Sequence, residues 1–165
     1  MMNEEYFSRL DAMDFAMAQD DGQSPANLSD ADVILVGVSR TSKTPTCIYL
    51  ANRGVKAANV PFVPNIPLPD ILTSNAAPLV VGLTEDPERL VSLRRSRLRM
   101  LNQTEFTNYA DLEAVRDEVN EARRFYTKMG WPVIDVTRRS IEETAAEVIK
   151  ILARRNLISS EALHF

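Results

Sequence analysis

One stretch decides the fold of this chain: Val33-Ile-Leu-Val-Gly-Val-Ser-Arg-Thr-Ser-Lys-Thr44. Its first four residues are an apolar run, which predicts a buried strand at about 32–36. The apolar segment 47–51 follows and predicts the body of a helix that reaches about Arg53. A tight loop therefore joins a strand to a helix that opens with Lys-Thr, which is the arrangement of a phosphate-binding P-loop.

We expect this loop to bind phosphate through its backbone. The N–H groups at the start of a helix face an anion, and the helix dipole favours negative charge there. Lys43 is expected to reach the terminal phosphates, and Thr44 to offer its hydroxyl to a magnesium ion. The residues that we assign to nucleotide binding are Gly37, Val38, Ser39, Arg40, Thr41, Ser42, Lys43 and Thr44.

The loop departs from the regular pattern at the position before the lysine. The pattern has glycine there, whereas this chain has Ser42. Because serine carries a Cβ, we expect a backbone conformation that tolerates one, and so a slightly altered loop. On spacing alone, an ordinary polar turn between strand and helix, with a surface lysine, is the alternative.

The composition is that of an ordinary globular protein. A chain of 165 residues suits one domain with a proper core, and its net charge of -4 gives no sign of bulk electrostatic binding to nucleic acid. No apolar run approaches the roughly 18 residues of a membrane span, and no signal-peptide pattern is present, so we expect a cytoplasmic protein. The single cysteine, Cys47, excludes an internal disulfide, and His164 is expected to lie in a frayed tail.

Strands alternate with helices along the rest of the chain. Further strands are expected at 57–63, 79–83 and 132–136. Helices are expected at 5–19, after the Asp86-Pro87 cap, from Asp111 to Gly130, and after a capping box of Ser140 and Glu143, with a polar loop at 102–109. This alternation predicts an α/β fold, a P-loop kinase-like parallel sheet with helices on both faces. Ligands of such sheets bind at the carboxyl ends of the strands, where 37–44 lies.

Phosphoryl transfer requires positive charge around the transferred group and a base for the acceptor hydroxyl. Lys43 is assigned a catalytic role, and Arg40 adds charge beside the loop. Of the arginines in 89–99 we expect one or two to contact phosphate and the others to form a solvated face. Asp20 and Asp21 are the candidate bases, with a helix-ending turn as the alternative.

The carboxylate partner of the metal stays unassigned from the sequence. No strand shows a clear apolar run that ends in aspartate opposite the loop. Asp135, within the last predicted strand, is a candidate for magnesium binding or for a structural role.

Several segments together carry a recognisable pattern over nearly all of residues 5–153. They are Asp32-Val-Ile-Leu-Val-Gly-Val-Ser-Arg-Thr-Ser-Lys-Thr-Pro-Thr46, Tyr49-Leu-Ala-Asn-Arg-Gly54, Ala58-Asn-Val-Pro61, Gly82-Leu-Thr-Glu-Asp-Pro-Glu-Arg-Leu90 and Trp131-Pro-Val-Ile-Asp-Val-Thr-Arg-Arg-Ser-Ile-Glu-Glu-Thr-Ala145. With these segments the chain resembles the bacterial pyruvate, phosphate dikinase regulatory proteins, and Tyr6-Phe7 and Asp20-Asp21-Gly22 fit the same family.

This resemblance implies a bifunctional serine/threonine kinase and phosphorylase. One activity uses ADP to phosphorylate a threonine of pyruvate, phosphate dikinase and so inactivates it. The other uses inorganic phosphate to remove that phosphoryl group and releases pyrophosphate. The resemblance implies that Gly37 to Thr44 bind ADP and that the dikinase is the protein partner. Our own hypothesis is that Asp20 or Asp21 accepts the threonine proton. We also expect Mg²⁺ as a cofactor, no nucleic-acid or membrane partner, and leave a homodimer open.

The chain departs from the family in two ways. Members of the family carry a further N-terminal domain, so residues 1–165 are expected to be a single P-loop nucleotide-binding kinase domain without it. The family often has histidine where this chain has Gln19, which puts a proton-shuttling role there in doubt.

Three competing functions stay open beside the one that the resemblance implies. The same chemistry could act on phosphoenolpyruvate synthase, but Thr41-Ser42 favours the dikinase, because regulators of the synthase more often have Cys-Gly before the lysine. The chain could be a small-molecule P-loop kinase, similar to shikimate or nucleoside-monophosphate kinases. It could also be a domain that binds nucleotide and transfers nothing.

Overall fold

Parallel strands form the centre of the molecule. In the described part of the chain a four-stranded sheet has the order β2-β1-β3-β4, and every neighbouring pair is parallel. The strands are β1 (Val33–Gly37), β2 (Ala57–Pro61), β3 (Leu79–Thr84) and β4 (Val133–Asp135). The computed structural model describes residues 4–18, 25–74, 78–101 and 108–162. The candidate bases Asp20 and Asp21, His164 and positions 102–107 lie outside the described residues.

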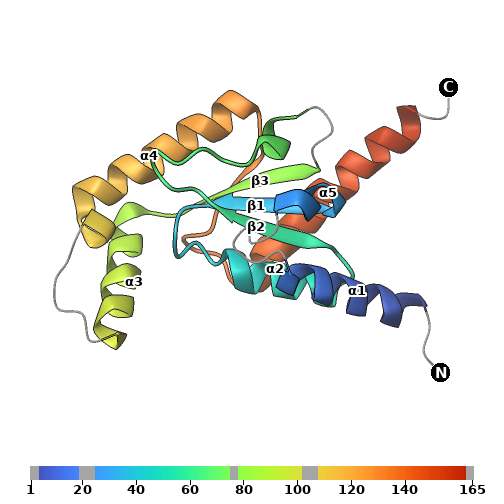
Figure 1. The fold of residues 1–165 in the computed structure, drawn as a ribbon, viewed down its shortest axis with the longest axis horizontal. Helices are drawn as coiled ribbons and strands as arrows, with labels where there is room; N and C mark the ends of the chain where they lie inside the picture. The colour runs from blue at the N-terminus through green and yellow to red at the C-terminus, as the bar shows by residue number, and fades with distance from the viewer. Residues whose placement is uncertain (1–3, 19–24, 75–77, 102–107, 163–165) are drawn as a thin grey trace.

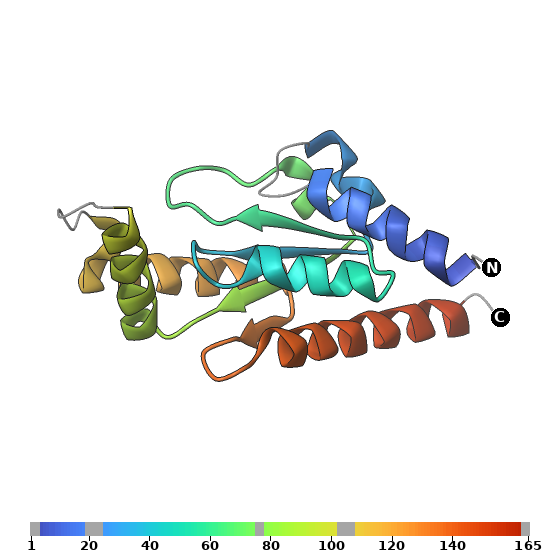
Figure 2. The same cartoon turned by 90° about the horizontal axis from the view of Figure 1, so that it is seen from below.

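Helices cover both faces of this sheet, as the sequence predicts (Figure 1). The α-helices are α1 (Glu4–Ala18), α2 (Lys43–Asn52), α3 (Pro87–Met100), α4 (Leu112–Met129) and α5 (Ile141–Ala162). Short 3₁₀ turns are η2 (Pro25–Asp30), η3 (Asp70–Thr73) and η4 (Asn108–Ala110). Helices α2 and α5 pack on one face and α4 on the other, whereas α1 packs on α2 (Figure 2). Helix α3 lies beyond the carboxyl ends of the strands, and its first turns join the core on the α4 side.

The pleat of β1 explains how one strand serves two cores. Every residue of β1 is buried, and successive side chains of a strand point to opposite faces. Val33 and Leu35 pack with residues of α2 and α5, whereas Ile34 and Val36 pack with residues of α3 and α4. A fully apolar run is therefore the pattern that a central parallel strand requires.

The predicted ends of the elements are mostly confirmed. Asp86 and Asp111 cap α3 and α4, with side-chain oxygens accepting from the backbone N–H groups three residues on. The helix-ending positions Gly54 and Gly130 have φ of 81° and 70°. Strand β2 is shorter than predicted and ends at Pro61, since Pro61 pairs with Gly37, the last residue of its partner β1.

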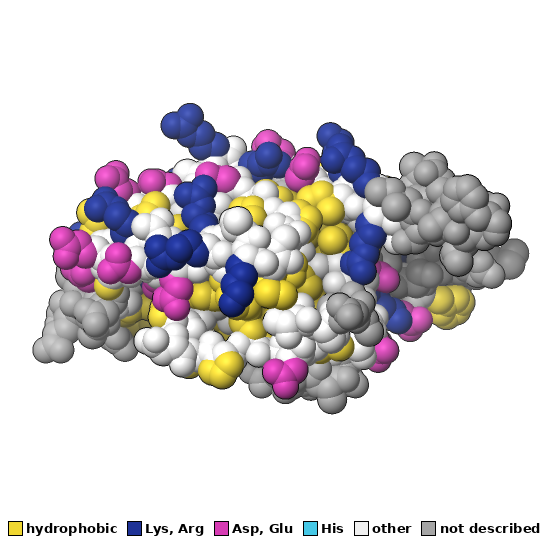
Figure 3. Space-filling model, turned by 90° about the horizontal axis from the view of Figure 1, so that it is seen from above, with side chains coloured by type: hydrophobic (Ala, Val, Ile, Leu, Met, Phe, Trp, Pro, Cys, Tyr) yellow, Lys and Arg dark blue, Asp and Glu magenta, His cyan; other side chains and the backbone are white. Residues whose placement is uncertain are grey.

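The outer surface on the α4 side shows no field of one charge. Lys and Arg side chains are interspersed with Asp and Glu on this face (Figure 3). None of the described helices is long and apolar enough to cross a membrane.

Tyr126 joins α4 to the two central strands. Its buried hydroxyl lies 3.2 Å from the Val36 oxygen and 3.1 Å from the Leu83 oxygen, and burial raises the pKa of this phenol. Its ring lies directly over Gly82, where an added Cβ would come within 2.5 Å of the ring. The glycine in β3 is therefore required by the close approach of α4.

We predict that Tyr126→Phe lowers the free energy of unfolding by about 1–2 kcal/mol, because a buried hydrogen-bonding group is lost. Urea denaturation measures the change. The matched control is Tyr49→Phe, whose hydroxyl meets Arg53 on the surface and should contribute little. Equal losses in the two variants would show that the Tyr126 hydroxyl does not join the helix to the strands.

Candidate functional site

A cavity of about 620 Å³ lies at the carboxyl ends of the strands. Its volume is within the range of small-molecule sites. The side chains that line it are Ser39, Arg40, Ser42, Lys43, Thr44, Pro45, Pro61, Glu85, Arg89, Leu93, Val136 and Arg139. Five of the eight loop residues predicted from the sequence therefore line the cavity, and Gly37, Val38 and Thr41 are not among its lining residues.

The cavity has a strongly cationic lining. Arg40, Lys43, Arg89 and Arg139 contribute positive charge, and Glu85 contributes the carboxylate among the described lining residues. Guanidinium groups match phosphate oxygens with paired hydrogen bonds, and an ammonium adds a compact charge. The N-terminus of α2 opens at the same place, since the helix begins at Lys43. This lining suits a ligand with several phosphate oxygens.

The loop is bent by two residues in the left-handed region. Arg40 has φ of 73° and Ser42 has φ of 63° and ψ of 30°. The expectation that serine would shift the loop to a backbone easy for a Cβ is wrong, because Ser42 adopts the conformation that favours glycine. This costs about 1–2 kcal/mol for a residue with a Cβ. Alternating right- and left-handed residues can gather N–H groups into an anion-binding concavity.

Side chains inside the loop fix its first turn. Thr41 Oγ1 and Lys43 Nζ each donate to the Val38 oxygen, at 2.9 Å. Lys43 is 6% exposed, so its ammonium is held at the base of the loop while its side chain also lines the cavity. A Cβ on Gly37 would lie 2.5 Å from Thr41 Oγ1, which explains the glycine at the start of the motif.

The sequence predicts that this loop binds ADP, and on that prediction Gly37→Ala should displace Thr41 and weaken ADP binding by about tenfold or more, as calorimetry can measure. The paired variant Gly37→Ala with Thr41→Ala removes the clashing atom and should bind ADP more tightly than Gly37→Ala alone. Thr41→Ala by itself is the control. If the two changes weaken binding additively, the contact between residues 37 and 41 does not shape the loop.

Sequence reasoning missed two charged residues of the cavity lining, Glu85 and Arg139. Glu85 follows β3, which lies beside β1, and it is 5% exposed. Its Oε1 lies 3.1 Å from Arg89 Nε, without the alignment of a hydrogen bond. Burial raises the pKa of Glu85, Arg89 opposes the rise, and Asp135 and Asp86 add to it. The available signal was an apolar strand, Leu79 to Thr84, with an acid directly after it.

The oxygen donors of the cavity fit magnesium. Thr44 offers a hydroxyl and Glu85 a buried carboxylate oxygen that no hydrogen bond satisfies. Magnesium prefers oxygen ligands and is commonly held by one or two protein groups together with substrate phosphates. Among the residues that the structure describes, no three His, Cys, Asp or Glu side chains gather into a metal site of their own. A magnesium ion here would therefore depend on the phosphates of a ligand.

Asp135, predicted to bind magnesium or to have a structural role, makes hydrogen bonds within the turn after β4. Its side chain accepts hydrogen bonds from the backbone N–H and the hydroxyl of Thr137, and it does not line the cavity. Burial raises the pKa of Asp135, but the bonds from Thr137 and the charges of Arg123 and Arg139 outweigh it, so the pKa is lowered on balance. Thr137 in turn accepts from the N–H of Asp86 at the start of α3.

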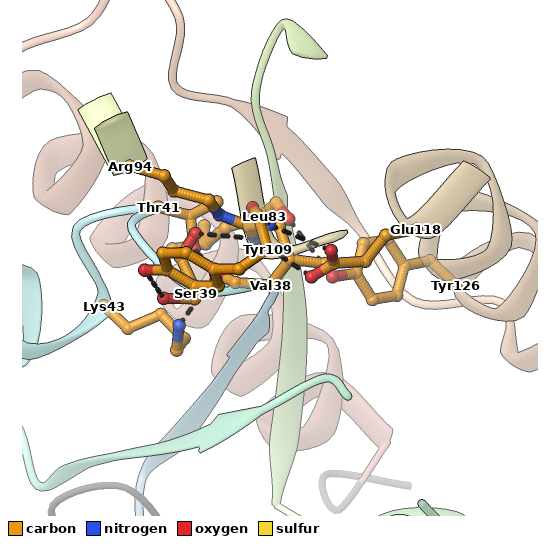
Figure 4. A network of polar contacts seen from close by, with 9 residues as sticks. All are labelled: Val38, Ser39, Thr41, Lys43, Leu83, Arg94, Tyr109, Glu118 and Tyr126. Atoms are coloured by element: carbon orange, nitrogen blue, oxygen red, sulfur yellow. Dashed lines mark hydrogen bonds and ion pairs between the residues drawn. The ribbon is translucent and has the colours of Figure 1, made fainter. Parts of the chain in front are cut away.

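The arginines of α3 separate into distinct roles. Arg89 lines the cavity, Arg94 is buried behind the loop, and Arg97 and Arg99 are exposed. Figure 4 shows Arg94 reaching from α3 toward Ser39 and Glu118. That one or two of these arginines contact phosphate stays a prediction, and buried Arg94 is not part of the solvated face expected of the others. Cys47 is buried, as expected of a small core side chain.

Sheet order, loop and cavity define an α/β protein of the P-loop kinase-like type. Comparison with known proteins gives the family. The chain belongs to the kinase/pyrophosphorylase family, which it matches over residues 1–149.

Its curated relatives bear names of one kind. A protein of Paramagnetospirillum magneticum is 56% identical over 153 residues, which is 93% of this chain and 49% of the relative. A protein of Rhodospirillum rubrum is 58% identical over 151 residues, covering 92% and 55%, and one of Novosphingobium aromaticivorans is 57% identical over 155 residues, covering 94% and 55%. All three names describe a pyruvate, phosphate dikinase regulatory protein. The chain spans about half the length of these relatives.

Proposed function

We propose that this chain is the nucleotide-binding part of a bifunctional regulator of pyruvate, phosphate dikinase. It would use ADP to phosphorylate a threonine of the dikinase and inorganic phosphate to remove that group. The cationic cavity formed by the loop, Arg89 and Arg139 at the sheet edge is the observation that supports this proposal most directly. The names of the relatives support the dikinase as the proposed protein partner.

In the kinase direction the β-phosphoryl group of ADP passes to the threonine oxygen. The bond between the bridging oxygen and the β-phosphorus breaks, a bond from the threonine oxygen to that phosphorus forms, and AMP leaves. The threonine proton goes to a base, for which Asp20 and Asp21 are proposed from the sequence alone. Lys43 and Arg40 would stabilise the charge on the transferred group.

In the dephosphorylation reaction an oxygen of inorganic phosphate attacks the phosphothreonine phosphorus, and the bond from the threonine oxygen to that phosphorus breaks. Pyrophosphate leaves, and the threonine oxygen takes up the proton that the attacking phosphate gives up. Pyrophosphate has the shape of the diphosphate of ADP, so one loop can serve both reactions. We therefore assign the same residues, 38–44, to phosphate binding in both directions.

Thr44 and Glu85 are the residues proposed to hold magnesium beside the phosphates. When bound, this ion would neutralise negative charge on the phosphate oxygens and help to orient them. Arg89, which pairs with Glu85, lies where it can contact a phosphate oxygen of the same ligand.

The proposal is tested by incubating the chain with the dikinase, ADP and Mg²⁺ and mapping phosphothreonine by mass spectrometry. Phosphothreonine with ADP but not with ATP supports the proposal. Transfer from ATP to a small acceptor favours a metabolite kinase, and modification of phosphoenolpyruvate synthase alone favours that enzyme as the target. ADP binding without any transfer favours a binding domain.

A further inference from the structure

Arg94 lies behind the phosphate loop and is fully buried. Its guanidinium makes paired hydrogen bonds of 2.9 Å to the two carboxylate oxygens of Glu118 on α4. It also donates to the backbone oxygen of Tyr109 at 2.9 Å and to the backbone oxygen of Ser39 at 3.1 Å (Figure 4). One side chain of α3 thus joins α4, η4 and the loop.

The side chain of Tyr109 contacts both Arg94 and Ser39. The Arg94 guanidinium lies 4.6 Å from the centre of the Tyr109 ring, within the range of a cation–π contact. The Tyr109 hydroxyl is 2.9 Å from Ser39 Oγ, which lines the cavity. Ser39 is therefore held by its backbone oxygen and by its side chain at once.

The bond to the Ser39 oxygen fixes the orientation of one peptide group. Peptide bonds in the described residues are trans, so the C=O of Ser39 and the N–H of Arg40 point to opposite sides. Because the oxygen is held by Arg94 behind the loop, the Arg40 N–H is turned away from Arg94. Arg40 then adopts its left-handed conformation and lines the cavity.

We propose that Arg94 is a positioning residue for nucleotide binding. By holding the Ser39 oxygen, it keeps the peptide between Ser39 and Arg40 turned so that the N–H remains available to a phosphate oxygen. Glu118 and Tyr109 hold the guanidinium in place for this task. The inference rests on the proposed function, since it takes the loop to bind the diphosphate of ADP.

A purely structural role for the ion pair is the competing explanation. Removing one partner of a buried pair leaves an uncompensated charge and destabilises a protein whatever else the pair does. Arg94→Met alone therefore does not separate the two explanations. Replacing both charges by apolar side chains is often tolerated by the fold, yet it still removes the bond to Ser39.

The test compares three variants of the chain. Arg94→Met with Glu118→Met removes the pair, and Arg94→Lys keeps a charge but cannot serve Glu118, Tyr109 and Ser39 together. Arg97→Met changes an exposed arginine of the same helix and is the matched control. ADP affinity is measured by calorimetry, folding by urea denaturation, and the Arg40 amide by ¹⁵N-resolved NMR.

We expect the paired variant to fold, to bind ADP about tenfold more weakly or worse, and to show a displaced Arg40 amide resonance. The ADP affinity of Arg94→Lys should lie between those of the paired variant and the unaltered chain. The ADP affinity of Arg97→Met should equal that of the unaltered chain. Folded variants with ADP affinity within about twofold of the unaltered chain would overturn the proposal. If the paired variant does not fold, Arg94→Lys decides by the same criterion.

A failure of the proposed function can be distinguished from a failure of the positioning role of Arg94. An unaltered chain that binds neither ADP nor pyrophosphate contradicts the proposed function. In that case the Arg40 amide still reports on the loop, and an unchanged resonance in folded Arg94 variants contradicts the positioning role.

Discussion

Lys43→Ala is expected to lower both the ADP-dependent and the phosphate-dependent activity by about a hundredfold or more. Removing one pre-positioned donor to a developing charge commonly has an effect of that size. Lys43 lies at the base of the loop, where its ammonium donates to the Val38 oxygen, and its side chain lines the cavity. The loss should be shared by the two proposed reactions, because we propose that both transfer a phosphoryl group at the same loop.

Both activities are measured by following phosphothreonine on the dikinase, once with ADP and once with inorganic phosphate. Lys128→Ala, which removes an exposed lysine of α4, is the control and should leave both rates unchanged. Near-normal activity of Lys43→Ala in either direction would contradict the shared-loop mechanism.

Glu85→Gln is expected to weaken magnesium-dependent ADP binding by about tenfold or more, since an amide keeps the shape but loses the charge that attracts the cation. Burial raises the pKa of Glu85, so this carboxylate takes up a proton at a higher pH than an ordinary glutamate does. As the pH falls, the unaltered chain should therefore lose its magnesium dependence earlier than a chain with an ordinary glutamate would. The Gln variant should show no such pH dependence.

Calorimetric ADP titrations at several Mg²⁺ concentrations and pH values measure both effects. Glu88→Gln, an exposed acid of α3, is the matched control. A proton bound more tightly in the folded state stabilises the fold at low pH, and this stabilisation is lost as pH rises through the raised pKa. The Gln variant should thus not be less stable at neutral pH, so weak binding would not reflect unfolding. An unchanged magnesium dependence would remove Glu85 from the site.

The fold could be predicted because its signals are local. The apolar run from Val33 to Val36 predicts a central strand. Capping residues predict helix ends at Asp86, Asp111 and Gly130. The loop that follows β1 could likewise be predicted, since strand, loop and helix adjoin in the chain. The parallel sheet then follows from the preference for parallel pairing in such alternating chains.

The rest of the site depends on contacts between distant segments. Arg94 contacts Ser39, from which it is separated by 55 positions in the sequence, and Glu118, from which it is separated by 24. No sequence spacing rule predicts either contact. Glu85 adjoins the loop because β3 pairs with β1, which places the ends of both strands at one edge. The left-handed conformation of Ser42 could not be predicted either, because tertiary contacts can hold a residue against its local preference.

The central claim is that the loop binds the diphosphate of ADP. Competition calorimetry tests it most directly, with ADP, AMP and pyrophosphate titrated into the chain in the presence of Mg²⁺. We expect ADP and pyrophosphate to compete for one site and AMP, which has one phosphate, to bind far more weakly. AMP binding as tightly as ADP, or pyrophosphate binding together with ADP, would contradict it.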